Sequence, residues 1–92
     1  MKTVIKLTAF WGNDDAESSI RISRRLWKDI QAGADFRTSA KSYYEGLRYQ
    51  VTWQFSKGLV TIDGEDGMQC VLDQTIDELL VQTITYPTSK NQ

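Results

Sequence analysis

The sequence predicts a small α+β fold in which an antiparallel sheet carries two helices on one face. Three observations support this prediction: a ten-residue run that alternates apolar and polar residues, two short segments with helical spacing, and glycines that fall at turns and element ends. The sheet is expected to consist of an N-terminal hairpin and a three-strand meander. Because 92 residues make one small domain, we expect a single domain over residues 1–86 and a flexible tail over residues 87–92.

The alternating run covers residues 47–56 and predicts a strand with one buried face. Successive side chains of a strand point to opposite faces, so the two sets of residues separate completely. The apolar set is Leu47, Tyr49, Val51, Trp53 and Phe55. The polar set is Arg48, Gln50, Thr52, Gln54 and Ser56. We expect the apolar set to face the core and the polar set to face water or a partner.

An N-terminal hairpin is expected before this strand. Residues 2–11 are predicted to form its first strand, and residues 19–22 alternate briefly and predict a short return strand. The intervening Gly-Asn-Asp-Asp sequence at residues 12–15 is a dense turn signal, because Gly and Asn tolerate positive φ.

The first helix is expected to run from Ser23 through Ala32. Ser23 has N-cap chemistry, and Gly33 suits the left-handed residue that ends a helix. The apolar side of the helix is Leu26, Trp27 and Ile30, and its basic side is Arg24, Arg25 and Lys28. Residues 34–42 show no clean period and are predicted to be a loop, with Phe36 turned inward.

The alternating strand is expected to continue into a hairpin through a Lys57-Gly58 turn, with Gly58 at positive φ. The register then places large apolar residues opposite each other on the inner face and polar residues opposite each other outside. The predicted pairs are Ser56 with Leu59, Phe55 with Val60, Gln54 with Thr61, and Trp53 with Ile62.

The remaining elements are a turn at residues 64–67, a third meander strand at residues 68–72 and a second helix. Thr75 and Glu78 have the Thr-x-x-Glu spacing of a capping box. The apolar stripe of this helix is Ile76, Leu79 and Leu80. Residues 81–86 fit either a helix or a strand, because they combine β-branched residues with an isoleucine that could continue either element.

Charge is unevenly distributed along a chain whose net charge is −1. Residues 20–48 contain seven basic and three acidic residues, a net of +4, whereas residues 49–92 contain two basic and six acidic residues, a net of −4. Such asymmetry can steer a charged partner. The alternative is that the two segments neighbour and neutralise each other in the fold.

The composition predicts a soluble cytoplasmic protein. Cys70 is the single cysteine, which rules out an internal disulfide and favours a reducing compartment. Lys6 interrupts the first apolar run, and no segment approaches the roughly 18 apolar residues of a membrane span. Cys70 lies beside Val71 in an apolar segment, so we expect it to pack in the core rather than react.

The chain has no histidine, which removes the commonest general base, the commonest metal ligand and every Ser-His or Cys-His arrangement. With one cysteine, zinc would have to be held mostly by carboxylates, which is an unusual ligand set. The acidic segment at residues 63–67 lacks the alternate carboxylates of a calcium loop and is interpreted as a solvated turn. We expect no enzyme activity, no metal and no cofactor. An acid–base enzyme using a pair of carboxylates is a third hypothesis.

The leading functional hypothesis is a small protein-binding module of inhibitor or immunity-protein type. Its candidate binding residues are Arg48, Gln50, Thr52, Gln54, Asp63, Glu65 and Asp66. The exposed aromatics expected to support an interface are Phe10, Tyr43 and Tyr44. Open edge strands also leave a homodimer to be considered. No membrane partner is expected.

The alternative is a nucleic-acid-binding protein that grips phosphates with the basic face of the first helix. Its candidate residues are Arg21, Arg24, Arg25 and Lys28. A pI of about 5.3 argues against this alternative, as does the ordinary occurrence of Arg and Lys on solvent-facing helix sides.

Overall fold

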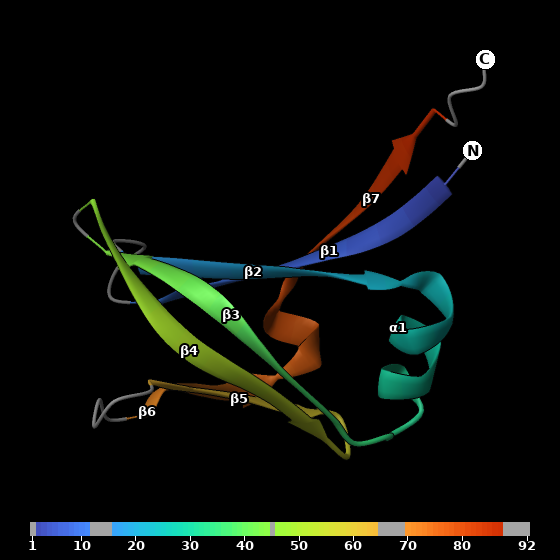
Figure 1. The fold of residues 1–92 in the computed structure, drawn as a ribbon. Helices are drawn as coiled ribbons and strands as arrows, with labels where there is room; N and C mark the ends of the chain where they lie inside the picture. Colours follow the sequence, from blue (N-terminus) through green and yellow to red (C-terminus); the bar gives the residue numbers. More distant parts are fainter. Residues whose placement is uncertain (1, 12–15, 45, 65–69, 88–92) are drawn as a thin grey trace.

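The computed structural model describes residues 2–11, 16–44, 46–64 and 70–87. Over these residues the chain forms one antiparallel sheet of seven strands in the order β6-β5-β4-β3-β2-β1-β7. The sheet curls into a half-barrel, with one α-helix and one short 3-10 turn beside its concave side (Figure 1). The elements are β1 (Lys2–Trp11), β2 (Ala16–Ser23), α1 (Arg24–Gln31), β3 (Phe36–Tyr44), β4 (Leu47–Ser56), β5 (Leu59–Gly64), β6 (Cys70–Thr75), η1 (Ile76–Glu78) and β7 (Leu80–Tyr86).

The prediction of two helices on one face is wrong, because the second helix is only the single turn η1. Its capping interaction does form: a carboxylate oxygen of Glu78 accepts hydrogen bonds from the Thr75 amide and hydroxyl at 3.4 and 3.2 Å. The chain turns to extended geometry at Leu79, which has φ −76° and ψ 146°. The next residues pair with β1 from Lys2 to Thr8. Pairing with a distant strand therefore decides the ambiguous segment 81–86 in favour of a strand.

The predicted loop over residues 34–42 is also wrong, because β3 occupies Phe36–Tyr44 and pairs with β4 along its whole length. Apart from Phe36, its inward positions carry small or polar residues such as Thr38, Ala40 and Ser42 rather than an apolar series, so the alternation is weak in the sequence. The β4 residues opposite Thr38 and Phe36 are Trp53 and Phe55, which are large and fully buried. The expectation that Phe36 turns inward is confirmed: its ring stacks on Phe55 with centroids 6.2 Å apart.

The N-terminal hairpin is confirmed, with a return strand longer than predicted. β2 extends over Ala16–Ser23 rather than residues 19–22 and pairs with β1 from Val4 to Trp11. The predicted turn at residues 12–15 lies outside the described residues. Of the turn predicted at residues 64–67, Gly64 ends β5 and the rest lies outside them as well. The third meander strand is β6, which starts at Cys70 and runs to Thr75. The side chain of Cys70 also lies outside the described part of the structure, so its core position stays a prediction.

The β4–β5 hairpin has the predicted register in all four pairs, from Ser56 with Leu59 to Trp53 with Ile62. Lys57 and Gly58 both have positive φ, 51° and 80°, which is the geometry of a two-residue turn matched to strand twist. Two backbone hydrogen bonds from other parts of the chain stabilise this turn. The Lys57 amide donates to the Gly33 carbonyl at 3.3 Å, and the Ile76 amide donates to the Gly58 carbonyl at 3.0 Å.

Helix α1 starts and ends as its sequence predicts. The Ser23 hydroxyl caps it by accepting a hydrogen bond from the Leu26 amide at 3.0 Å. Gly33 has a φ of 103°, and its amide donates to the Ile30 carbonyl at 3.0 Å. Ile30 is fully buried, so the helix closes one end of the half-barrel.

The core fills the concave side of the sheet, where the inward residues of the strands meet Ile30 and Leu79. Its buried members are Ile5, Leu7, Ala9, Ile20, Ile22, Ile30, Val51, Trp53, Phe55, Val60, Ile62 and Leu79. Leu26, Trp27 and Ile76 pack against this cluster. The sheet thus covers its own inner face by curling, a role that the sequence assigned to two helices.

A buried hydroxyl connects three strands at the point where β2 and β3 separate. The two strands pair only from Ala16 to Ser18. The Trp53 indole N–H donates to the Ser18 hydroxyl at 2.9 Å, and this hydroxyl donates to the Lys41 carbonyl at 2.7 Å. Trp53 and Ser18 are almost completely buried. Each buried polar group of this chain of hydrogen bonds therefore has a partner.

Replacing the buried hydroxyl, Ser18→Ala, is expected to lower the free energy of unfolding by about 1–3 kcal/mol, because a buried indole N–H loses its acceptor. Urea unfolding followed by Trp fluorescence measures this loss. Ser39→Ala is the matched control, since Ser39 is exposed on neighbouring β3. Equal effects of the two substitutions would show that the hydroxyl does not hold the strands together.

Candidate functional site

The charged residues among the described side chains of the strands lie on the convex surface of the half-barrel, which we call the outer face. Successive residues of a strand point to opposite faces, so every second position is directed away from the core. The outward positions are Lys2, Val4, Lys6, Thr8 and Phe10 on β1, Glu17, Ser19, Arg21 and Ser23 on β2, Arg37, Ser39, Lys41 and Tyr43 on β3, Arg48, Gln50, Thr52, Gln54 and Ser56 on β4, and Leu59, Thr61 and Asp63 on β5. Strand β7 adds Leu80, Gln82, Ile84 and Tyr86.

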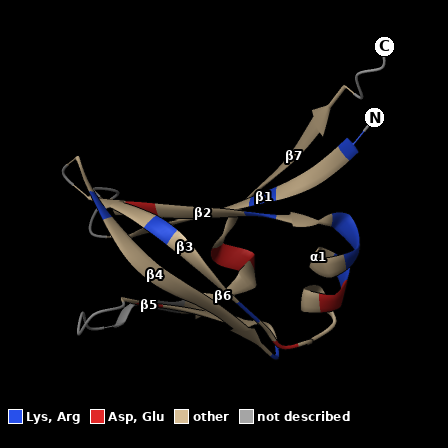
Figure 2. Ribbon diagram, viewed as in Figure 1, with Lys and Arg blue, Asp and Glu red and all other residues tan. Residues whose placement is uncertain are grey.

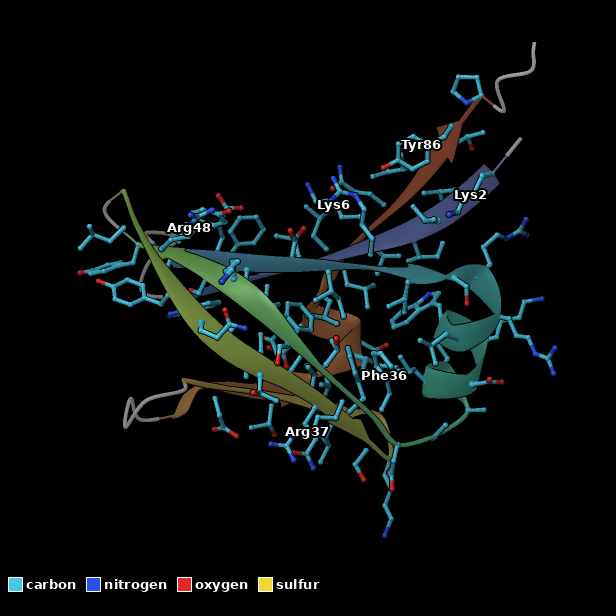
Figure 3. The ribbon with its side chains drawn as sticks, viewed as in Figure 1. Lys2, Lys6, Phe36, Arg37, Arg48 and Tyr86 are labelled. Atoms are coloured by element: carbon cyan, nitrogen blue, oxygen red, sulfur yellow. The ribbon has the colours of Figure 1, made fainter. Side chains whose placement is uncertain are left out.

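This outer face is basic, although the whole chain is weakly acidic. Across the described side chains of β1–β5 and β7, its charged residues are Lys2, Lys6, Arg21, Arg37, Lys41 and Arg48 against Glu17 and Asp63. Figure 2 shows basic residues on β1, β2, β3 and β4. In Figure 3, Lys6 and Arg48 project away from the enclosed core, and Arg37 does so at the other end of the β3–β4 pair. The cations are therefore distributed over the outward positions of β1 to β4.

The most unusual charge arrangement is the opposition of Lys6 and Arg21. They are direct cross-strand neighbours in β1 and β2, and Gln82 lies opposite Lys6 on the other side. Within the described strands, no acidic residue occupies a cross-strand or diagonal outward position around them. Like charges directly opposite each other destabilise a sheet. The pair therefore costs stability within the monomer.

One row of cross-strand neighbours on the outer face combines exposed aromatic residues with charged residues. Phe10, Glu17, Tyr43 and Arg48 are successive cross-strand neighbours from β1 to β4. Phe10 and Tyr43 are 42% and 47% exposed. The expectation that Phe10, Tyr43 and Tyr44 are exposed aromatics is confirmed, and Tyr44 lies on the other face. Register alone brings Phe10 and Arg48 into one row, since they are far apart in the sequence.

The residues predicted from the sequence to bind a protein partner fall into two groups. Arg48, Gln50, Thr52 and Gln54 all lie on the outer face of β4, and Asp63 joins them as the cross-strand neighbour of Thr52. The Gln50 side-chain oxygen accepts a hydrogen bond from the Lys41 ammonium. Glu65 and Asp66 lie outside the described residues.

The residues predicted to bind nucleic acid are divided between two elements. Arg21 lies on the outer face of β2, whereas Arg24, Arg25 and Lys28 are exposed on α1. Arg24 and Arg25 are the first two residues of the helix, and its first turn has no acidic residue. Cations at the positive end of the helix dipole are unfavourable. These arginines therefore do not stabilise α1.

One concave feature was not predicted from the sequence. An open depression of about 300 Å³ lies at the end of the β3–β4 pair. It is lined by Asp35, Phe36, Arg37, Gln54, Phe55 and Ser56. The sequence offered no signal for it, because its β3 side belongs to the segment predicted to be a loop.

The described residues contain no cluster of three or more His, Cys, Asp or Glu side chains that could hold a metal ion. Within the same part of the chain, no helix combines the length and the apolarity needed to cross a membrane. No family model matches the sequence, and comparisons with curated proteins and with solved structures give no significant match.

Reversing one charge of the opposed pair, Lys6→Glu, is expected to stabilise the fold by about 0.2–1 kcal/mol, because repulsion from Arg21 becomes attraction. Urea unfolding at low ionic strength measures the change. Lys2→Glu is the matched control, since Lys2 lies opposite Tyr86 in the described register rather than opposite a cation. The same gain in both variants would mean that the opposed pair carries no local repulsion.

Proposed function

We propose that this chain is a non-catalytic protein-binding module of inhibitor or immunity-protein type that binds an acidic protein surface through its outer face. The opposed Lys6–Arg21 pair carries the proposal. Two like charges held side by side cost stability in the free protein, and an acidic partner would convert that cost into attraction. Charge complementarity of this kind increases the association rate and suppresses wrong partners.

The aromatic row supports a protein rather than a small molecule as the partner. Tyrosine and arginine are enriched among residues that dominate interface energies, and Tyr43 and Arg48 are cross-strand neighbours here. Both are exposed. They stand on regular strands, and residues on a sheet are positioned more rigidly than residues on loops.

The polar residues of β4 extend this surface. Gln50 is held by its hydrogen bond from Lys41, and Gln54 is exposed on the same face. These neutral side chains can pair with backbone or side-chain groups of a partner without the desolvation cost of a charge. We place this interaction in the reducing cytoplasm, since the sequence has a single cysteine.

Affinity capture from native extract tests the proposal. The wild-type chain is expected to retain one protein stoichiometrically, and Arg21→Glu and Arg48→Glu are each expected to weaken binding about tenfold, equal to about 1.4 kcal/mol. Lys57→Glu is the matched control, because it makes the same charge change in the β4–β5 turn away from the outer face. Absence of a retained protein, or equal retention by all variants, would contradict the proposal.

A nucleic-acid-binding function is the second candidate, and the arginines at the start of α1 favour it. Arg24 and Arg25 occupy a helix terminus where cations cost stability. A helix N-terminus already attracts anions through its amide groups, and two guanidinium groups add charge and hydrogen-bond donors suited to phosphate.

The double substitution Arg24→Glu with Arg25→Glu separates this candidate from the first. It is expected to abolish retention on single-stranded DNA or RNA while raising helix stability by about 0.3–1 kcal/mol per residue, so lost binding cannot reflect unfolding. Wild-type affinity is expected to fall steeply with salt concentration. Lack of wild-type binding at low salt would remove this candidate.

A further inference from the structure

Strand β7 ends the sheet at an exposed edge. Its single neighbour among the described strands is β1. Six of its seven residues are exposed, and Ile84 is half-buried. In Figure 1, β7 and the start of β1 extend away from the rest of the molecule, so the edge is accessible. An edge strand presents a row of backbone donors and acceptors that another strand can pair with.

The sequence of β7 has none of the features that usually protect such an edge. Leu80–Tyr86 reads LVQTITY, without a charge, a proline or a glycine. The strand at the other edge, β6, differs: its sequence includes Asp73, and its pairing with β5 is interrupted by a register shift at Ile62 and Asp63. Charges and bulges discourage pairing with other chains. Pro87 follows β7 directly and limits pairing to these seven residues.

The side chains of β7 complement a second copy of the same strand. A two-fold axis perpendicular to the sheet keeps the inner faces of both copies on one side, so residues of equal parity must lie opposite each other. The one such antiparallel register that pairs all seven residues is centred on Thr83. It places Thr83 opposite Thr83, Val81 opposite Thr85, Gln82 opposite Ile84, and Leu80 opposite Tyr86. Threonine pairs and apolar–aromatic pairs are favourable across strands.

Exposed apolar residues and the charge distribution agree with this pairing. Leu80, Val81 and Tyr86 are 46%, 42% and 41% exposed in the monomer, and each gains an uncharged neighbour across the axis. The nearest cations, Lys2 and Lys6, belong to β1. The two β1 strands would lie three strand spacings apart, about 14 Å, which exceeds the screening length of about 8 Å at physiological salt.

We propose that β7 is the interface of a symmetric homodimer, in which two copies pair antiparallel through a register centred on Thr83 and form one continuous sheet. This inference does not depend on the identity of the outer-face partner. The dimer leaves both outer faces on the same side of the joined sheet, because the axis is perpendicular to it.

Sedimentation velocity of the full chain tests the dimer over micromolar to submillimolar concentrations. The wild type is expected to dimerise, whereas Thr83→Lys and Thr83→Glu each place like charges opposite each other and are expected to raise the dimer dissociation constant at least about tenfold. An equimolar mixture of the two variants is expected to restore a dimer, because lysine then faces glutamate. Ser39→Lys, an exposed change on central strand β3, is expected to dimerise like the wild type.

Hydrogen exchange of the wild type provides a test without substitutions. Amide protection is expected to rise with protein concentration in β7 and not in β6. A wild type that stays monomeric, a Thr83→Lys variant that dimerises normally, or a mixture that stays monomeric would each overturn the proposal. Concentration-dependent protection in β6 instead of β7 would overturn it as well.

Discussion

The fold depends on one buried hydroxyl at the point where β2 and β3 part. Backbone pairing between these strands stops after Ser18 and Ser42, and the buried Trp53 side chain reaches Ser18 at this point. The Ser18 hydroxyl accepts the indole N–H and donates to the Lys41 carbonyl. It thereby gives a core side chain and a strand carbonyl their hydrogen-bond partners where the ladder ends. A sheet can curl this sharply because these polar groups remain satisfied.

Curling determines which surfaces remain for function. The inner face is filled by the core, and α1 covers one end. Backbone hydrogen bonds with Gly33, which follows α1, and with Ile76 of η1 hold the β4–β5 turn. The convex face and the β7 edge therefore remain accessible, and they differ in chemistry. The convex face carries opposed cations such as Lys6 and Arg21, whereas β7 is uncharged. The first suits a charged partner, and the second suits backbone pairing with an uncharged strand.

The sequence predicted well those elements whose signals are local. Strict alternation in β4 placed Val51, Trp53 and Phe55 in the core and Arg48 and Gln54 on the opposite face, as the structure does. Leu47, at the start of the strand, was expected in the core but is 59% exposed. Strand β3 was not predicted from the sequence. Phe36 is the one large apolar residue among its inward positions, so the segment shows no apolar–polar alternation. The second helix was wrong because a capping box at Thr75 stabilises one turn and cannot specify how far a helix continues.

The sequence by itself determined the Lys57-Gly58 turn, the ends of α1 and the outward face of β4, because turn chemistry, capping and alternation act between residues close in the chain. Only the tertiary structure decided that β7 pairs with β1, and that Lys6 lies opposite Arg21. The candidate binding surfaces arise from these pairings between strands. Strand neighbours are chosen by contacts between residues distant in sequence, and each such contact must repay the entropy of closing a long loop. A local sequence pattern does not show whether contact energy exceeds the entropy of loop closure. The order of the strands, and with it the charge of the outer face, is therefore decided only in the folded chain.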